Sequence, residues 1–133
     1  MSHYRSNLPD LEFNLFEVHR IQDRLNRWEG LDEVTVRDIL AEVERFAREE
    51  WAESFVEADR TPLELNDGEV ALPEGLKASL SAVAEAGWTK LGLNEELGGM
   101  EVPPSLFWAV QELFLGGNAT ATLYAGGALF ARI

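Results

Sequence analysis

Cysteine is absent from the 133-residue chain, and histidine occurs only twice. Without cysteine there are no disulfides, no thiolate nucleophile and no zinc site built on thiolates, a pattern that suits a reducing compartment. His3 lies near the start of the chain and His19 lies within a charged segment, so neither is expected to act as a general base. Catalysis by cysteine or histidine is therefore not expected.

Positive charge and long apolar runs are also scarce. Lys and Arg number 11 against 24 Asp and Glu, which gives a formal net charge of −13, and such a surface repels nucleic-acid backbones and anionic membranes. No segment approaches the roughly 18 consecutive apolar residues of a membrane span, and the opening MSHYRSNLPD lacks the apolar part of a signal peptide. We expect no nucleic-acid partner, no membrane insertion and a cytoplasmic location.

Apolar residues are nevertheless plentiful, at 46% of the chain, which is enough to build the core of a single domain. Their spacing of three or four residues is typical of amphipathic helices. Apart from a weakly indicated extended pair around Leu65 and Val70, the chain shows no convincing β-type alternation. The predicted fold class is all-α, a bundle of about five helices that forms a single domain over residues 1–133.

The first two predicted helices lie in the N-terminal part of the chain. Residues 8–28 are expected to form one amphipathic helix, within an extension that covers residues 1–30. The second helix is expected to begin at Thr35 as its N-cap, with the main domain covering residues 35–133. The apolar stripe of this second helix consists of Val36, Leu40, Val43, Ala47, Trp51 and Phe55.

Proline, glycine and asparagine mark the ends of the other helices. Pro73 is expected to open the third helix, and Gly87 to end it in a left-handed conformation. Pro103 and Pro104 are expected to open the fourth, and Asn118 to cap the fifth. Between the third and fourth helices lies GWTKLGLNEELGGMEVPP, which has neither dinucleotide-binding nor phosphate-loop spacing. Its own residues indicate a helix cap joined to a turn.

The last segment, ATATLYAGGALFARI, is apolar on nearly every side, so we expect it to be buried all round. Gly126 and Gly127 within a helix each cost about 1 kcal/mol relative to alanine. Either another helix crosses closely at this point or a ligand lies along the glycine face, and the pattern leaves both open. Since no stop signal follows, the domain is expected to be truncated at its C-terminal end.

The order of these motifs resembles the N-terminal α-helical domain of the acyl-CoA dehydrogenases, which are FAD-dependent enzymes of fatty-acyl oxidation. The glycine-rich segment is similar to the family's Gly-Leu-Pro-Glu-Glu-x-Gly-Gly-x-Gly loop, with Asn94 and Glu101 in place of its usual proline and glycine. Upstream, FVEADRTPLELNDGEVALPEGLKASL resembles the family's acid-arginine-x-proline turn and the helix that follows it. The opening YRSNLPDLEFNLFEV is similar to the extension of a subgroup with a longer subunit.

The resemblance implies an oxidoreductase that dehydrogenates fatty acyl-CoA thioesters. Family members continue into a β-barrel domain and a C-terminal helical domain, which carry the catalytic base and most of the FAD contacts. By this resemblance the chain holds no catalytic or cofactor-binding residue, binds no FAD and is inactive alone. The family's acyl-chain pocket maps to Ala121, Thr122, Ala125 and Leu129.

The expected partners are acyl-CoA, in the full-length context, and a second copy of the chain, because an unpartnered apolar helix favours a homo-oligomer. An alternative hypothesis is a stand-alone acidic helical module that docks other proteins through its last helix. A third is a metal–carboxylate bundle, but acid pairs such as Glu49 with Glu50 and Glu95 with Glu96 are expected to be solvated. No metal is therefore expected.

Overall fold

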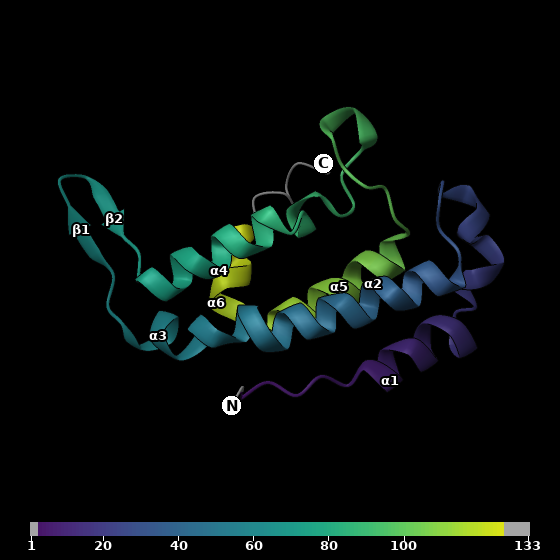
Figure 1. Cartoon of the computed structure of the whole chain (residues 1–133), viewed down its shortest axis with the longest axis horizontal. Helices are drawn as coiled ribbons and strands as arrows, with labels where there is room; N and C mark the ends of the chain where they lie inside the picture. The colour runs from purple at the N-terminus through teal and green to yellow at the C-terminus, as the bar shows by residue number, and fades with distance from the viewer. Residues whose placement is uncertain (1–2, 127–133) are drawn as a thin grey trace.

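The computed structural model describes residues 3–126 and is predominantly helical over that range, which confirms the predicted all-α class (Figure 1). The helical elements before the strands are α1 (Leu8–Glu12), η1 (Phe13–Val18), η2 (Ile21–Arg27), α2 (Glu33–Phe46), η3 (Ala47–Trp51), η4 (Ala52–Ser54) and α3 (Phe55–Arg60). The later elements are β1 (Glu64–Asn66), β2 (Glu69–Ala71), α4 (Glu74–Glu85), η5 (Trp88–Lys90), η6 (Glu95–Leu97), α5 (Pro104–Gly117) and α6 (Ala119–Ala125).

The expectation of one continuous helix over residues 8–28 is wrong. The segment is helical but divides at Arg20, which has a left-handed φ of 48°. A continuous stripe would place Val18 in the core, yet Val18 is 56% exposed and Phe16 is buried instead. The turn at Arg20 allows η2, a 3₁₀ helix, to bury its own apolar residues from a new direction.

Helix α2 begins at Glu33 with Asp32 as its N-cap, so the predicted N-cap at Thr35 is also wrong. The side-chain Oδ1 of Asp32 accepts a hydrogen bond from the backbone N–H of Thr35 at 2.8 Å. The apolar stripe is confirmed from Val36 to Trp51, where all its members are buried, while Phe55 is only half-buried. A π-helical turn, η3, carries the stripe beyond the end of α2.

The weakly indicated extended pair is present as a two-stranded antiparallel sheet, in which Leu65 lies opposite Val70. Asp67 and Gly68 form its turn, with φ values of 50° and 88°. Every residue of both strands is exposed. The hairpin projects from one end of the molecule and contributes nothing to the core (Figure 1).

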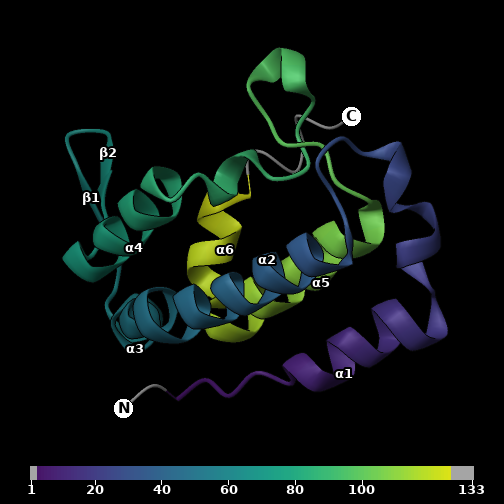
Figure 2. The same ribbon diagram turned by 45° about the vertical axis from the view of Figure 1, so that its right-hand side comes forward.

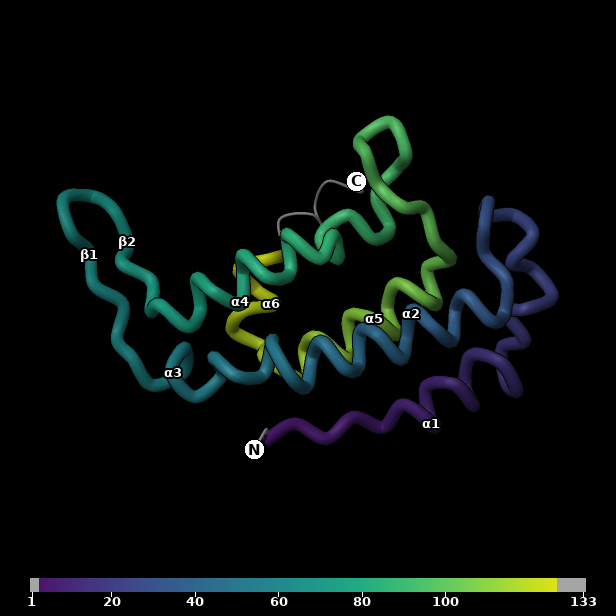
Figure 3. The backbone as a smooth tube through the Cα atoms, viewed as in Figure 1, coloured from purple at the N-terminus to yellow at the C-terminus, as the bar shows by residue number. Residues whose placement is uncertain are grey.

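The predicted boundaries of the later helices are confirmed. Pro73 precedes α4, and Gly87 follows it with a left-handed φ of 80°. Pro104 opens α5, and Asn118 caps α6. The glycine-rich segment between α4 and α5 folds back on itself, since the N–H of Gly92 donates to the carbonyl of Met100 at 2.7 Å, and its tip projects from the helices (Figure 3).

The core lies around the paired helices α2 and α5, with α1 along the outer side of α2 (Figure 2). Helix α6 crosses the end of this pair and contacts α3, α4 and α5. Its described turns are not buried all round as expected, because Leu123 is 79% exposed and Tyr124 is 44% exposed. Neighbours cover only one face of α6. Within residues 3–126, no helix has both the length and the apolarity needed to cross a membrane.

Candidate functional site

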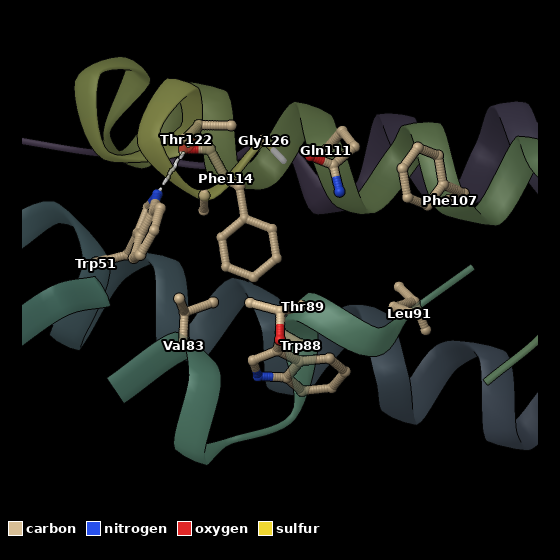
Figure 4. A pocket seen from close by; sticks show the side chains of 11 residues that line it. Trp51, Val83, Trp88, Thr89, Leu91, Phe107, Gln111, Phe114, Thr122 and Gly126 are labelled. Atoms are coloured by element: carbon tan, nitrogen blue, oxygen red, sulfur yellow. Dashed lines mark hydrogen bonds between the residues drawn. The ribbon is translucent and has the colours of Figure 1, made fainter. Parts of the chain in front are cut away.

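A small cavity of about 40 Å³ lies where α6 and α5 face the end of α4 and the short helix η5 (Figure 4). Its walls are mostly apolar and aromatic. The residues that line it are Trp51, Val83, Trp88, Thr89, Leu91, Phe107, Gln111, Phe114, Thr122, Ala125 and Gly126. They come from five separated segments of the chain, so only the tertiary structure brings them together.

Two of the four residues predicted for the acyl-chain pocket, Thr122 and Ala125, line this cavity. Ala121 lies on the same helix but is fully buried in the core and does not line it. Leu129 lies outside the described residues. Gly126, which the sequence singled out for its cost within a helix, ends α6 as its C-cap and also lines the cavity.

A buried hydrogen-bond network holds α6 against the rest of the cavity wall. The indole Nε1–H of Trp51 donates to the carbonyl of Phe114 at 3.1 Å and to the hydroxyl of Thr122 at 3.2 Å. The same hydroxyl donates to the carbonyl of Asn118 at 2.7 Å. The proton of Thr122 is therefore already engaged within the protein, and this residue presents no free donor to the cavity.

Asn118 is the centre of the network and is fully buried. Its Oδ1 accepts from the backbone N–H of Ala121 at 3.0 Å, which caps α6. Its Nδ2 donates to the carbonyl of Trp51 at 3.1 Å and to the hydroxyl of Ser54 at 3.0 Å, and that hydroxyl pairs with Ser79 at 2.8 Å. Since buried polar groups need such partners, these bonds determine where α6 begins and hence where the cavity wall lies.

The cavity has no ionisable side chain in its lining, so the described residues offer it no general acid, general base or charged nucleophile.

The side chains with a shifted pKa lie outside the lining of this cavity. Burial, with the carboxylates of Glu44 and Glu112, raises the pKa of Tyr4 to about 12. His3 stacks on Phe55 at 4.4 Å between ring centroids. Over residues 3–126, no three His, Cys, Asp or Glu side chains come together in a way that could hold a metal ion.

Sequence reasoning missed the aromatic part of this site. Trp51 was assigned only to an apolar stripe and Phe114 to no site, yet both line the cavity, with ring centroids 5.5 Å apart in an edge-to-face arrangement. Trp88 and Gln111 were not identified at all. An aromatic residue directly after the helix-ending Gly87 was the available signal for Trp88, because a large apolar side chain at a helix end usually packs against a neighbour.

No family model matches the chain. In an alignment of 137 residues that covers the whole chain, it is 50% identical to "Broad-specificity linear acyl-CoA dehydrogenase FadE5" of Mycobacterium tuberculosis (strain ATCC 25618 / H37Rv). The chain spans only 22% of the length of that relative. This identity confirms the resemblance to the acyl-CoA dehydrogenases that the motif order predicts, and it shows the chain to be similar throughout to one part of such a protein.

Proposed function

We propose that the chain is the N-terminal helical domain of an FAD-dependent acyl-CoA dehydrogenase and that it supplies part of the acyl-chain pocket. The observation that carries this proposal is the 50% identity over the whole chain, together with a mostly apolar cavity lined by Thr122 and Ala125. We propose that Ala121, which is buried in the core, and Leu129 belong to the wall of the complete pocket. The enzyme class is an oxidoreductase that removes hydrogen from the α and β carbons of fatty acyl-CoA thioesters.

The dimensions of the cavity support a shared pocket rather than a complete one. A volume of about 40 Å³ holds a few water molecules at most, whereas pockets for whole ligands are commonly several hundred Å³. We therefore propose that other parts of the enzyme provide the remaining walls. The domain would exclude water from the acyl chain and position it through apolar contacts.

The lining of this cavity does not fit an FAD site. The cavity is lined by no Lys or Arg side chain that could pair with the pyrophosphate, and it is far too small for an isoalloxazine ring. We propose that the flavin contacts and the catalytic base belong to polypeptide outside these 133 residues. The chain by itself is then predicted to bind no FAD and to be inactive.

The first experiment uses the purified 133-residue chain. After incubation with FAD, it is desalted and assayed with acyl-CoA thioesters of several lengths and an artificial electron acceptor. We expect no retained flavin absorbance and no acceptor reduction. A yellow protein that turns over acyl-CoA would contradict the assignment of the base and the flavin contacts to other polypeptide.

The second experiment tests the pocket directly. The chain replaces the homologous segment of the Mycobacterium tuberculosis relative, and the chimera is assayed for acyl-CoA dehydrogenation. In this chimera Ala125→Phe should lower kcat/KM for long acyl chains about tenfold, because a large side chain fills space that about two methylenes would occupy. Tyr124→Phe is the matched control, since Tyr124 is its neighbour on α6 but does not line the cavity. Equal chain-length profiles for the two variants would argue against the proposal.

Exposed apolar residues support a further part of the proposal, which is self-association. Helix α5 exposes Trp108 and Leu115, which are 61% and 45% exposed and lie on one face, and α6 exposes Leu123. We propose a homo-oligomer in the cytoplasm. The same surface favours the second candidate function, an acidic helical module that docks another protein. Sedimentation that gives a monomer at high concentration would count against self-association.

A further inference from the structure

The cavity has a shallow side and a deep side. Trp88, Thr89 and Gln111 are partly exposed and mark its mouth. Trp51 is the most buried lining residue, at 1% exposed, against 4–5% for Val83, Leu91, Phe107 and Phe114. Figure 4 shows the side chain of Trp51 at the opposite end of the cavity from Leu91 and Phe107, beside Thr122. An acyl chain that entered at the mouth and advanced along α6 would meet the indole of Trp51.

The indole of Trp51 is fixed from several directions. Its Nε1–H is shared between the carbonyl of Phe114 and the hydroxyl of Thr122, and its ring packs at 5.5 Å against Phe114 and at 6.3 Å against Phe46, between ring centroids. Gly117 also approaches it closely, since a Cβ at Gly117 would lie 3.3 Å from Cδ1 of the indole. Rotation of the indole would break hydrogen bonds and lose these contacts.

A buried polar network adjoins the backbone of Trp51. The backbone carbonyl of Trp51 accepts from Nδ2 of Asn118, which also binds the hydroxyl of Ser54. An acyl chain that displaced the indole and reached this region would separate buried hydrogen-bonding groups from their partners, and each such group is costly to leave unpaired. Displacing Trp51 would therefore disturb both these hydrogen bonds and the packing of its ring on Phe46 and Phe114.

We propose that Trp51 limits how deeply an acyl chain penetrates the pocket and that the hydroxyl of Thr122 positions Trp51 for this role. Trp51 is a specificity-determining residue that touches the end of the chain, and Thr122 acts through it. This inference rests on the proposed function, because it concerns the depth of the same pocket. It adds a residue from η3 to a wall that the family resemblance assigned only to α6 and the residues after it.

The test uses the chimera with the Mycobacterium tuberculosis relative, in which the remaining walls of the pocket are present, and straight-chain acyl-CoA thioesters of about four to about sixteen acyl carbons as substrates. The value of kcat/KM is measured for each chain length. In the unmutated chimera we expect kcat/KM to rise about fourfold per added methylene and then to stop rising at the length at which the acyl chain reaches Trp51. In Trp51→Phe, which has a smaller ring and no N–H donor, this rise in kcat/KM should continue for about one or two further methylenes.

A second pair of variants separates positioning from general stability. Thr122→Val keeps the shape of the side chain but removes the hydroxyl, so kcat/KM should keep rising to longer acyl chains, as in Trp51→Phe. It should also accelerate hydrogen exchange of the indole N–H about fivefold. Thr122→Ser keeps the hydroxyl and should restore the wild-type limit. A purely structural role would lower the melting temperature and leave the length limit unchanged.

The outcomes distinguish this inference from the function on which it rests. If Ala125→Phe lowers kcat/KM for long acyl chains but the unmutated chimera, Trp51→Phe and Thr122→Val stop rising at the same chain length, the role of Trp51 is overturned and the pocket remains. If Ala125→Phe also leaves the chain-length profile unchanged, both the pocket and its depth limit are overturned. A longer limit in Trp51→Phe and Thr122→Val, with the wild-type limit in Thr122→Ser, supports the inference.

Discussion

The side chains of Asp32 and Asn118 cap α2 and α6 in the same way, but one cap lies in water and the other in the core. Oδ1 of Asp32 accepts from the backbone N–H of Thr35 at 2.8 Å, and Oδ1 of Asn118 accepts from that of Ala121 at 3.0 Å. Asp32 is exposed, whereas Asn118 is fully buried. Asn118 also donates two further hydrogen bonds, which tie α6 to the segment around Trp51.

This difference shows that the same local motif carries different energetic weight in different surroundings. Water can replace the hydrogen bond that an exposed cap makes. Removing that cap therefore lowers the free energy of unfolding only by the cap's contribution to helix stability. Water cannot reach the partners of a buried cap, so each is left unsatisfied when the cap is removed. The cap of α6 is therefore part of the cavity wall as well as a helix end.

The largest effect is expected for Asn118→Ala. The substitution removes the cap of α6 and leaves the buried carbonyl of Trp51 and the hydroxyl of Ser54 each without one donor, so the free energy of unfolding should fall by about 3 kcal/mol. Urea denaturation measures this loss. The same substitution at Asp32 is the control, and equal losses at the two caps would remove the distinction between them.

Asn118→Asp should make the buried cap dependent on pH. Burial raises the pKa of the new carboxyl in the folded state above its unfolded value of about 3.9. The variant is then most stable below the unfolded pKa, and its stability is lost as the pH rises through the raised folded pKa. Melting temperatures from about pH 3 to about pH 7 should fall for this variant relative to the wild type. If the melting temperatures of the variant and the wild type change with pH in parallel, water reaches the side chain at position 118.

Ser54→Ala should have an intermediate effect. It removes one of two acceptors for Nδ2 of Asn118 and one of two partners of the Ser79 hydroxyl while leaving the cap itself intact. The expected loss in the free energy of unfolding is about 1–2 kcal/mol. Ser81→Ala on the exposed face of α4 is the matched control, with an expected change within about 0.5 kcal/mol. A similar loss for both serines would contradict the importance of burial.

The smallest effect is expected at the exposed cap. The backbone N–H of Thr35, which donates to Asp32, lowers the pKa of that carboxyl below its usual value. The stabilisation is therefore present above the ordinary pKa and is lost as the pH falls through the lowered one. Asparagine caps a helix as effectively as aspartate does, but its side chain does not titrate. Asp32→Asn should therefore not show this loss of stability below about pH 4. A difference in melting temperature of about 2 °C is expected, and calorimetry that shows identical acid profiles would contradict the titration of this cap.

The two caps also show how far local sequence patterns predict the fold. Asn118 was predicted correctly, because a glycine pair before it ends the preceding helix and leaves a single position for the cap. At α2, Asp32 and Thr35 are both good capping residues three positions apart, so the local pattern alone does not decide between them. The sequence contains both signals, and the hydrogen bond from Thr35 to Asp32 shows that they belong to one cap.

The candidate site was predictable only on α6. Thr122 and Ala125 follow from the family resemblance, because they lie in one continuous motif. Trp51, Trp88 and Phe114 come from other elements, and their convergence depends on how α4, α5 and η3 pack together. No sequence spacing contains that information, since the contact between Trp51 and Thr122 joins residues 71 positions apart.

The helical class, most helix ends and the family resemblance follow from local sequence patterns, because they depend on the spacing of apolar residues and on the local chemistry of proline, glycine and asparagine. The packed fold was needed to show that the first predicted helix divides at Arg20, that Asn118 is a buried junction and that Trp51 lines a cavity. These features depend on which polar groups lose access to water, and burial is a property of the packed chain rather than of any local segment.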